Sequence, residues 1–97
     1  MNSSSDIFLL PGNVLRNVAQ REKTLRKSRG ISQEQLAKNA GVSLGSLRRF
    51  EQTGHIAFDS LVAISFALGC ESDIEGLFQA PAYTSIEEVI ERARETR

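Results

Sequence analysis

The hydrophobic residues of this chain recur at helical spacing, in segments that are separated by proline or glycine. In the longest segment, residues 14–29, one face is apolar except at Glu22. Only residues 7–10 have the pattern of a strand, and four residues make a short one. The pattern therefore predicts an all-α protein with helices over residues 14–29, 33–39, 44–52, 58–68 and 73–78, and from residue 86.

Short polar residues stand where helix N-caps are expected, because their side-chain oxygens can accept a hydrogen bond from the first turn. Ser32 with Gln35, and Ser85 with Glu88, have the spacing of a capping box. Gly41 fits the position after a helix end, where a positive φ is common. The expected N-caps are Asn13, Ser32, Ser43, Ser72 and Ser85.

The composition predicts a single small domain and argues against a zinc site, an internal disulfide and a membrane span. Ninety-seven residues, 40% of them apolar, make one domain with one modest core. One cysteine and one histidine cannot supply the ligands of a zinc site, and the cysteine has no disulfide partner, so a cytoplasmic protein is expected. The longest apolar run is four residues, which predicts no membrane contact. Without a Ser–His–Asp set or a glycine-rich phosphate loop, the sequence predicts neither an enzyme nor a cofactor.

The net charge of zero hides two halves of opposite charge. Residues 1–57 hold nine Lys and Arg against four acids, which gives +5. Residues 58–97 hold three Arg against eight acids, which gives −5. A basic half suggests a polyanionic partner, whereas an uneven distribution in a small domain can also arise by chance.

The segment from Ser32 to Glu51 has the form of two short helices joined by a tight turn that contains glycine. Ala37 is small enough for the two helices to cross closely, and Gly41 can adopt the positive φ of the turn. Leu47 and Phe50 anchor the second helix, so its other face points outward. The pattern predicts a helix-turn-helix whose second helix turns one face to solvent.

The same stretch resembles the phage repressor and Cro class of helix-turn-helix proteins, the Xre family, over about residues 25–78. The resemblance implies a compact five-helix, repressor-like DNA-binding domain within residues 13–80. A short apolar N-terminal arm over residues 1–12 and an additional amphipathic helix within residues 81–97 flank it. The matching positions are Leu25, Arg26, Ser32, Gln33, Leu36, Ala37, Gly41, Val42, Ser43, Leu47, Glu51, Leu61, Ala67, Leu68, Gly69, Leu77 and Phe78.

The resemblance also implies roles for single residues. The positions over the base edges are Ser43, Leu44, Gly45, Ser46 and Arg49, and Arg49 can reach one guanine bidentately, a contact worth about 1–3 kcal/mol. The phosphate-contacting positions are Gln33, Arg48, Gln52, Thr53 and His55. Arg26 and Glu51 occupy positions that pair in the family. Four alternatives remain. Leu44 is an exposed apolar residue rather than a contact to a thymine methyl, and Gln33 is a helix-cap residue rather than a phosphate contact. Arg48 is simply solvated, and His55 is an ordinary loop residue.

The two flanks supply candidate protein-binding surfaces. The apolar residues Ile7, Phe8, Leu9 and Leu10 of the arm, and Ile86, Val89 and Ile90 of the last helix, either cover the chain's own domain, form a homodimer or bind another protein. The resemblance implies a transcription regulator that reads double-stranded DNA as a dimeric repressor on a palindromic operator, and it permits the role of an autoregulating antitoxin that binds a cognate toxin. The alternative is a protein-interaction module of the same fold that has lost specific DNA binding, which Leu44 and Gly45 favour because neither offers a base a hydrogen bond.

Overall fold

The computed structural model describes residues 9–80 and 86–95, and in this part of the chain every regular element is an α-helix. The predicted all-α class and the order of its helices are confirmed. Residues 1–8 of the expected arm lie outside the described residues, and Leu9 and Leu10 are exposed and not in a strand. The helices are α2 (Pro11–Ser28), α3 (Gln33–Ala40), α4 (Leu44–Thr53), α5 (Phe58–Ala67), α6 (Glu71–Glu75) and α7 (Ile86–Glu95).

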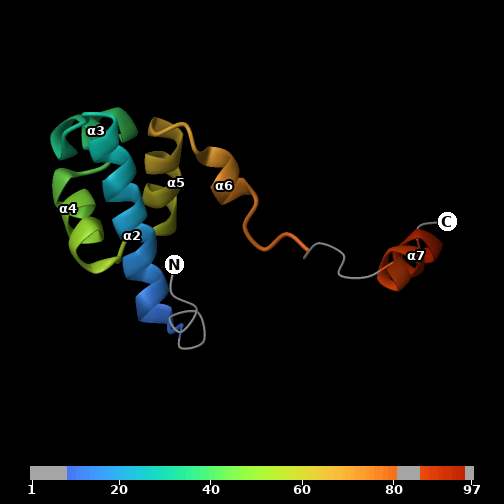
Figure 1. The fold of residues 1–97 in the computed structure, drawn as a ribbon. Helices are drawn as coiled ribbons and strands as arrows, with labels where there is room; N and C mark the ends of the chain where they lie inside the picture. The colour runs from blue at the N-terminus through green and yellow to red at the C-terminus, as the bar shows by residue number, and fades with distance from the viewer. Residues whose placement is uncertain (1–8, 81–85, 96–97) are drawn as a thin grey trace.

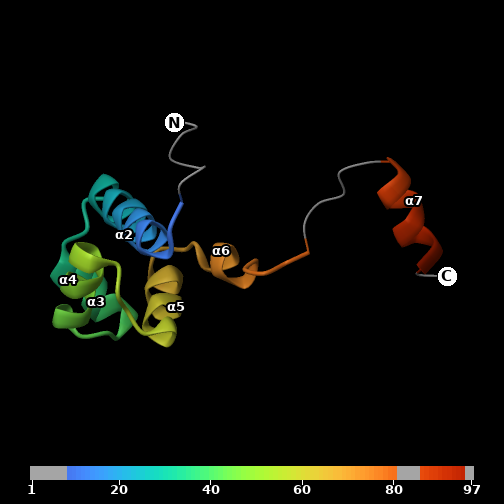
Figure 2. The same cartoon turned by 90° about the horizontal axis from the view of Figure 1, so that it is seen from below.

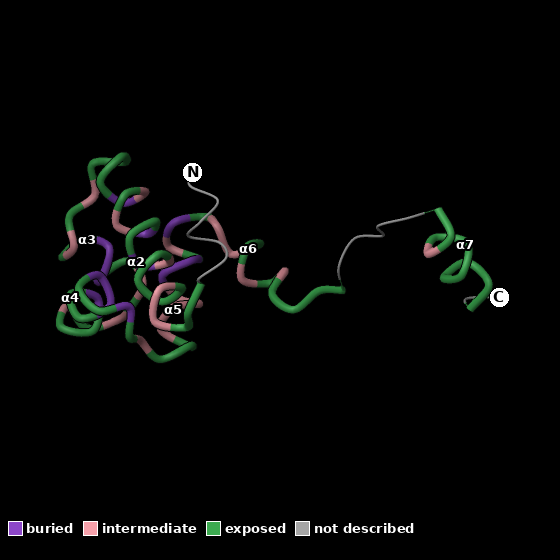
Figure 3. The backbone as a smooth tube through the Cα atoms, turned by 60° about the horizontal axis from the view of Figure 1, so that its bottom comes forward, coloured by how far each residue is buried: buried purple, intermediate pink, exposed green. Residues whose placement is uncertain are grey.

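Helices α2 to α5 pack around one small core, and Figure 3 shows the buried backbone gathered there. α2 packs against α4, and α3 packs against both α4 and α5 (Figures 1 and 2). α6 follows α5 and contacts it. Full burial of a leucine or phenylalanine contributes about 1.5–3 kcal/mol, so these few side chains hold the domain together. The core residues are Ala19, Leu36, Ala37, Leu47, Phe50, Ile64 and Leu68.

The N-caps of the two helix-turn-helix helices form as expected. The Ser32 Oγ accepts from the Gln35 amide, and the Ser43 Oγ accepts from the Ser46 amide, both at 3.0 Å. The capping box at Ser32 is only half formed, because the Gln35 side chain donates to Asn39 at 2.7 Å instead of returning to the cap. The cap expected at Ser85 lies outside the described residues.

Two expected N-caps are wrong. α2 begins at Pro11 with Leu10 as its N-cap, since proline is favoured at the first helical position, where its missing N–H is not needed. Asn13 lies one turn inside, and its Oδ1 accepts from the Leu10 amide at 3.3 Å. α6 begins at Glu71 after Cys70, so Ser72 is already within the helix. Glu71 and Asp73 stand in the first turn of α6, where negative side chains are favoured.

Two glycines hold the backbone in the left-handed region that the fold requires. Gly41 has φ 71° in the helix-turn-helix turn, as the sequence predicts. Gly54 ends α4 with φ 84° and lies against α2 so closely that an added Cβ would be 2.6 Å from the Leu15 carbonyl carbon. This close approach brings the end of α4 against the first half of α2.

Helix α7 is set apart from the other helices (Figures 1 and 2). The radius of gyration is 17.4 Å, against about 12–13 Å for a compact chain of this length. The apolar residues Ile86, Val89 and Ile90 of α7 are all exposed. Among the described residues, no helix is long and apolar enough to cross a membrane.

Candidate nucleic-acid interface

Helix α4 presents one face to the core and the other to solvent. Leu47 and Phe50 are fully buried, which fixes the rotation of α4 about its own axis. Of the five positions expected over base edges, four are exposed, and Leu44 is half-buried and packs against the core. The exposed ones are Ser43, Gly45, Ser46 and Arg49. The expected base-contact positions thus lie at the first turns of α4, on its solvent side.

The two serines at the start of α4 are not equivalent as hydrogen-bond donors. The Ser43 hydroxyl accepts from the Ser46 amide and donates to the Ser46 Oγ at 2.8 Å. Its proton is therefore committed within the cap. The Ser46 hydroxyl only accepts in this pair, which leaves its own proton available to an acceptor outside the protein.

Arg48 and Arg49 project from the middle of α4 into solvent. Within residues 9–80 and 86–95, no hydrogen bond or ion pair engages either guanidinium. A guanidinium carries five N–H donors in a planar fork that matches guanine O6 and N7 or two phosphate oxygens. Both side chains are thus uncommitted donors on the exposed side of the helix.

The residues expected to contact phosphates differ in how far their side chains are already engaged. At the first position of α3, the Gln33 Nε2 donates to the Glu51 Oε1 at 2.9 Å. The Thr53 hydroxyl donates to the Arg49 carbonyl at 2.7 Å and accepts from the His55 amide at 3.2 Å. Gln52 and the His55 side chain are exposed. At Gln33, the groups still available to a phosphate are the second amide hydrogen and the backbone N–H of the helix N-terminus.

Arg26 and Glu51 form a buried, bidentate ion pair between α2 and α4. The Arg26 Nε and Nη2 donate to the two carboxylate oxygens of Glu51, each at 2.8 Å, and Nη1 donates to the Ile31 carbonyl at 2.9 Å. The pairing that the sequence resemblance implies is present in the structure. Because the fork fixes two side chains in one plane, it sets the position of α4 relative to α2.

The pKa of Glu51 follows from these contacts. Burial by itself raises the pKa of a carboxyl group, but hydrogen bonds from Arg26, Glu22 and Gln33 outweigh it and lower the pKa of Glu51 to about 2. The pKa of Arg26 is raised by its hydrogen bonds to Glu51. Both partners are therefore charged at neutral pH.

A model of a helix-turn-helix family, described as "Helix-turn-helix", matches residues 23–74. The match covers more than half of the chain and contains α3, α4 and the turn between them. The chain belongs to this helix-turn-helix family. Its domain is that of Xre-family proteins, and the protein is a DNA-binding regulator of that kind. Comparison with curated proteins found no match.

Seven of the nine cations of residues 1–57 lie within the family match, and Arg16 and Arg21 lie just before it on α2. The cations of the +5 half lie on α2, α3 and α4 or in the loop that follows α2, and this is the part that carries the DNA-binding motif. The family match ends at residue 74, so α7 with its four glutamates lies beyond it. The basic character that the sequence analysis found in residues 1–57 belongs to the DNA-binding unit.

Glu22 belongs to the same buried cluster, and its role was missed from the sequence. It lies on α2 one turn before Arg26, is only 8% exposed, and has both carboxyl oxygens buried without an ordinary donor. Burial and then the hydrogen bond and negative charge of Glu51 raise the pKa of Glu22 to about 8. Two charged carboxylates would leave the Glu22 oxygens unsatisfied, whereas a proton on Glu22 can be donated to Glu51. The signal in the sequence was the one acidic residue on an otherwise apolar helix face.

Proposed function

We propose that this protein is a sequence-specific transcription regulator that binds double-stranded DNA as a dimeric repressor. Helix α4 enters the major groove, and two copies read the halves of a palindromic operator about 34 Å apart. The observation that carries the proposal is α4 itself. A buried ion pair and two core side chains hold it, and Arg48 and Arg49 stand uncommitted on its solvent side.

Within this proposal the two neighbouring arginines of α4 have different tasks. Arg49 reads a guanine edge, while Arg48 contacts the phosphate backbone. Ser46 donates its free hydroxyl proton to a base or phosphate. Leu44, half-buried against the core, contributes packing and reaches a thymine methyl only with its exposed part. Gly45 lets the DNA backbone or a base approach the start of α4 closely, because no side chain covers that turn.

The other positions expected to contact DNA act on its phosphate backbone. Gln33, at the N-terminus of α3, offers a phosphate its backbone N–H groups, while its side chain supports Glu51. Gln52 and Thr53 end α4 and His55 follows Gly54, and all three are exposed and contact DNA phosphates in this proposal. These contacts fix orientation and carry no sequence information.

The role of an autoregulating antitoxin is one form of this proposal. It is supported by an amphipathic helix, α7, that lies beyond the family match and exposes its apolar side chains. A protein-interaction module without specific DNA binding is the second candidate. It is favoured by the absence of hydrogen-bonding side chains at Leu44 and Gly45. A measurement of how DNA affinity depends on salt concentration would distinguish the two candidates, because only a DNA-binding regulator is expected to show salt-dependent binding to a selected site.

The test is selection of bound genomic fragments by the full chain, followed by titration of the selected site over a range of salt concentrations. A DNA-binding regulator loses affinity linearly in the logarithm of salt concentration. The variant Arg49→Ala is expected to lose affinity for the selected site but not for a scrambled one, which narrows the difference between the two by about 1–3 kcal/mol. Its matched neighbour, Arg48→Ala, is expected to weaken both sites alike and to reduce the salt slope by about one.

Three results would count against the proposal. Failure to retain any genomic fragment at low salt would favour the interaction module. Equal effects of the two arginine variants on specificity would refute the division of roles within α4. A selected site without two-fold symmetry would refute the palindromic operator.

A further inference from the structure

Helix α5 carries apolar residues on every side, although only one of its sides packs into the core. A helix that is apolar all round is ordinarily covered on all sides. Phe58, Val62 and Phe66 recur every fourth residue and form one row, roughly 12 Å long, outside the core. Phe66 is 65% exposed and Phe58 60%, although both are large aromatic side chains. In the part of the chain that the structure describes, this row therefore lacks a cover.

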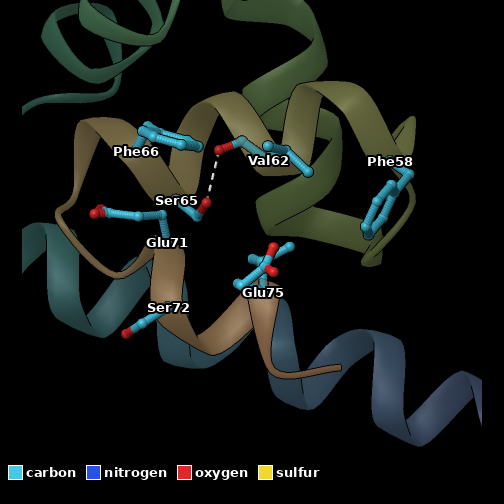
Figure 4. A pocket seen from close by; sticks show the side chains of 8 residues that line it. Phe58, Val62, Ser65, Phe66, Glu71, Ser72 and Glu75 are labelled. Carbon is cyan, nitrogen blue, oxygen red and sulfur yellow. Dashed lines mark hydrogen bonds between the residues drawn. The ribbon is translucent and has the colours of Figure 1, made fainter. Parts of the chain in front are cut away.

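The uncovered row forms one wall of a groove of about 510 Å³ between α5 and α6 (Figure 4). Ser65 also lines this groove, as a buried polar side chain. Its hydroxyl donates to the Val62 carbonyl at 2.6 Å, as the dashed line in Figure 4 shows. Apolar side chains can therefore cover the groove without leaving this donor unsatisfied. The α5 wall thus fits an apolar occupant.

The rim of the groove on the α6 side is negatively charged. Glu71 and Glu75 are one helical turn apart and line the groove from α6, across from the α5 side chains in Figure 4. The sequence holds no Lys or Arg between Arg49 and Arg92. Within residues 9–80 and 86–95, no ion pair engages either rim carboxylate. The rim therefore carries a charge that a cation on an occupant can neutralise.

Helix α7 has an exposed apolar stripe, but its charge does not match this rim. It carries two arginines against four glutamates, which gives a net charge of −2. This charge opposes docking beside Glu71 and Glu75, and the α7 of a second copy has the same charge. DNA is a polyanion and is repelled in the same way. The groove calls for an occupant that brings both apolar side chains and positive charge.

We propose that the α5–α6 groove binds an amphipathic helix of a different protein, one whose apolar stripe is bordered by Lys or Arg. Such a helix lays its apolar face into a hydrophobic groove, which is a common mode of peptide recognition. The row on α5 has the four-residue spacing of a ridge against which a second helix packs. Cations beside the stripe then lie near Glu71 and Glu75, and this charge complementarity selects a basic partner over an acidic one.

The groove lies apart from the surface proposed to contact DNA. None of its lining residues is among the positions expected to contact bases or phosphates. α6 lies away from α4 in both ribbon views (Figures 1 and 2). The basic partner can therefore occupy the groove while α4 is bound to DNA. The inference concerns protein–protein contact, and its test uses no DNA, so its failure is distinguishable from failure of the DNA-binding proposal.

The first experiment selects binders of the full chain from a displayed library of helical peptides. The peptides are about 18 residues long, because shorter ones are marginal helices in water. Each has a fixed stripe of leucines and random residues beside it, and those that also bind Phe66→Glu are removed. We expect the remaining peptides to be enriched in Lys and Arg beside the stripe. Enrichment in Asp and Glu, or a lack of peptides that require Phe66, would overturn the proposal.

Fluorescence anisotropy then measures the affinity of one selected peptide for the wild type and for variants that circular dichroism shows to be folded. Phe66→Glu is expected to weaken binding about thirtyfold or more. Glu71→Gln and Glu75→Gln are each expected to weaken it about two- to fivefold, with a smaller effect at high salt. The matched control is Asp59→Asn, since Asp59 is exposed on α5 and does not line the groove. A loss in the control as large as that in the two glutamine variants would contradict the role of the rim.

Two further measurements distinguish the partner from occupants within this chain. Ile90→Glu places a charge on the α7 stripe and is expected to leave the peptide affinity unchanged. A gain in affinity would show that α7 covers the groove, and the proposal would be wrong. Sedimentation equilibrium of Phe66→Glu is expected to give the same mass as the wild type. A dimeric wild type that this variant returns to one chain would make the groove a contact between copies and would equally overturn the proposal.

Discussion

Replacing Glu22 by glutamine removes a buried acid and keeps its shape. In the fold, the pKa of Glu22 is raised from 4.5 to about 8 by burial and by Glu51. The protonated side chain therefore contributes stability that is fully present below pH 4.5 and is lost as the pH rises through 8. Glutamine has an N–H donor for Glu51 at every pH, so the variant should not lose stability in this window.

The magnitude follows from the two pKa values. A difference between 4.5 and about 8, at about 1.4 kcal/mol per pH unit, sets an upper bound of about 5 kcal/mol on the loss. Local relaxation of the fold and entry of water reduce such burial penalties. We therefore expect a loss of about 2–3 kcal/mol in the wild type between pH 5 and pH 8, a large part of the stability of a small domain.

Glu51 has the opposite dependence. Its pKa is lowered to about 2 in the fold, so the stability of its ion pair is present above pH 4.5 and is lost as the pH falls towards 2. The wild type should thus be most stable near pH 5.

The assay is urea denaturation followed by circular dichroism at pH 5, 6, 7 and 8. The wild type is expected to unfold at progressively lower urea concentrations, while the midpoint of Glu22→Gln stays nearly constant and exceeds that of the wild type at pH 8. Glu34→Gln is the control, because Glu34 is exposed on the neighbouring helix α3 and should leave the pH dependence unchanged. A wild-type midpoint that is constant over this range, or a glutamine variant less stable than the wild type at pH 8, would refute the proton shared between Glu22 and Glu51.

Two further variants examine the contacts that hold α4. Gly54→Ala adds a Cβ at φ 84° and 2.6 Å from the Leu15 carbonyl carbon, so the free energy of unfolding in urea is expected to fall by about 2–4 kcal/mol. The control is Gly30→Ala, at φ 67° with open space around it, where the free energy of unfolding should fall by only about 1 kcal/mol. Equal losses in the two variants would contradict the close approach of Gly54 to Leu15. Arg26→Leu leaves the Glu51 carboxylate buried without its cation, so the free energy of unfolding should fall by about 3–5 kcal/mol. Adding Glu51→Leu removes the unpaired charge and should recover part of that loss. A double variant that is less stable than Arg26→Leu would contradict the cost assigned to the unpaired charge.

Much of the fold follows from local sequence signals. Ser32, Ser43 and Gly41 mark the helix-turn-helix correctly, because a cap or a positive φ depends on one residue and its immediate neighbours. The predicted N-caps at Asn13 and Ser72 are wrong, although both residue types are favourable caps. α2 begins two residues before Asn13, at Pro11, and α6 begins one residue before Ser72, at Glu71. Helix starts are decided by competition among neighbouring residues, and a single favourable side chain does not settle the result.

The buried cluster required information that lies far apart in the chain. The resemblance pointed to the Arg26–Glu51 pair, but the contribution of Gln33 becomes visible only when α3 and α4 are placed together. Glu22 was recognised as an interruption of an apolar face, yet nothing in its local sequence shows that its neighbour is another acid 29 positions later. Likewise, the sequence around Gly54 indicates only an ordinary helix end. The close approach of Gly54 to the backbone of Leu15 on α2 appears only in the folded structure.

The cluster around Glu51 ties the proposed recognition helix α4 to α2 through Arg26 and to α3 through Gln33. α4 carries the exposed arginines, and its register against α2 depends on a carboxylate that accepts from Arg26, Gln33 and, when protonated, Glu22. Loss of the Glu22 proton would place two negative charges side by side beneath the proposed recognition helix. The stability of the contacts that anchor α4 is therefore expected to depend on that proton. A hydrophobic replacement of the whole cluster would remove this pH dependence together with the polar contacts that fix α4.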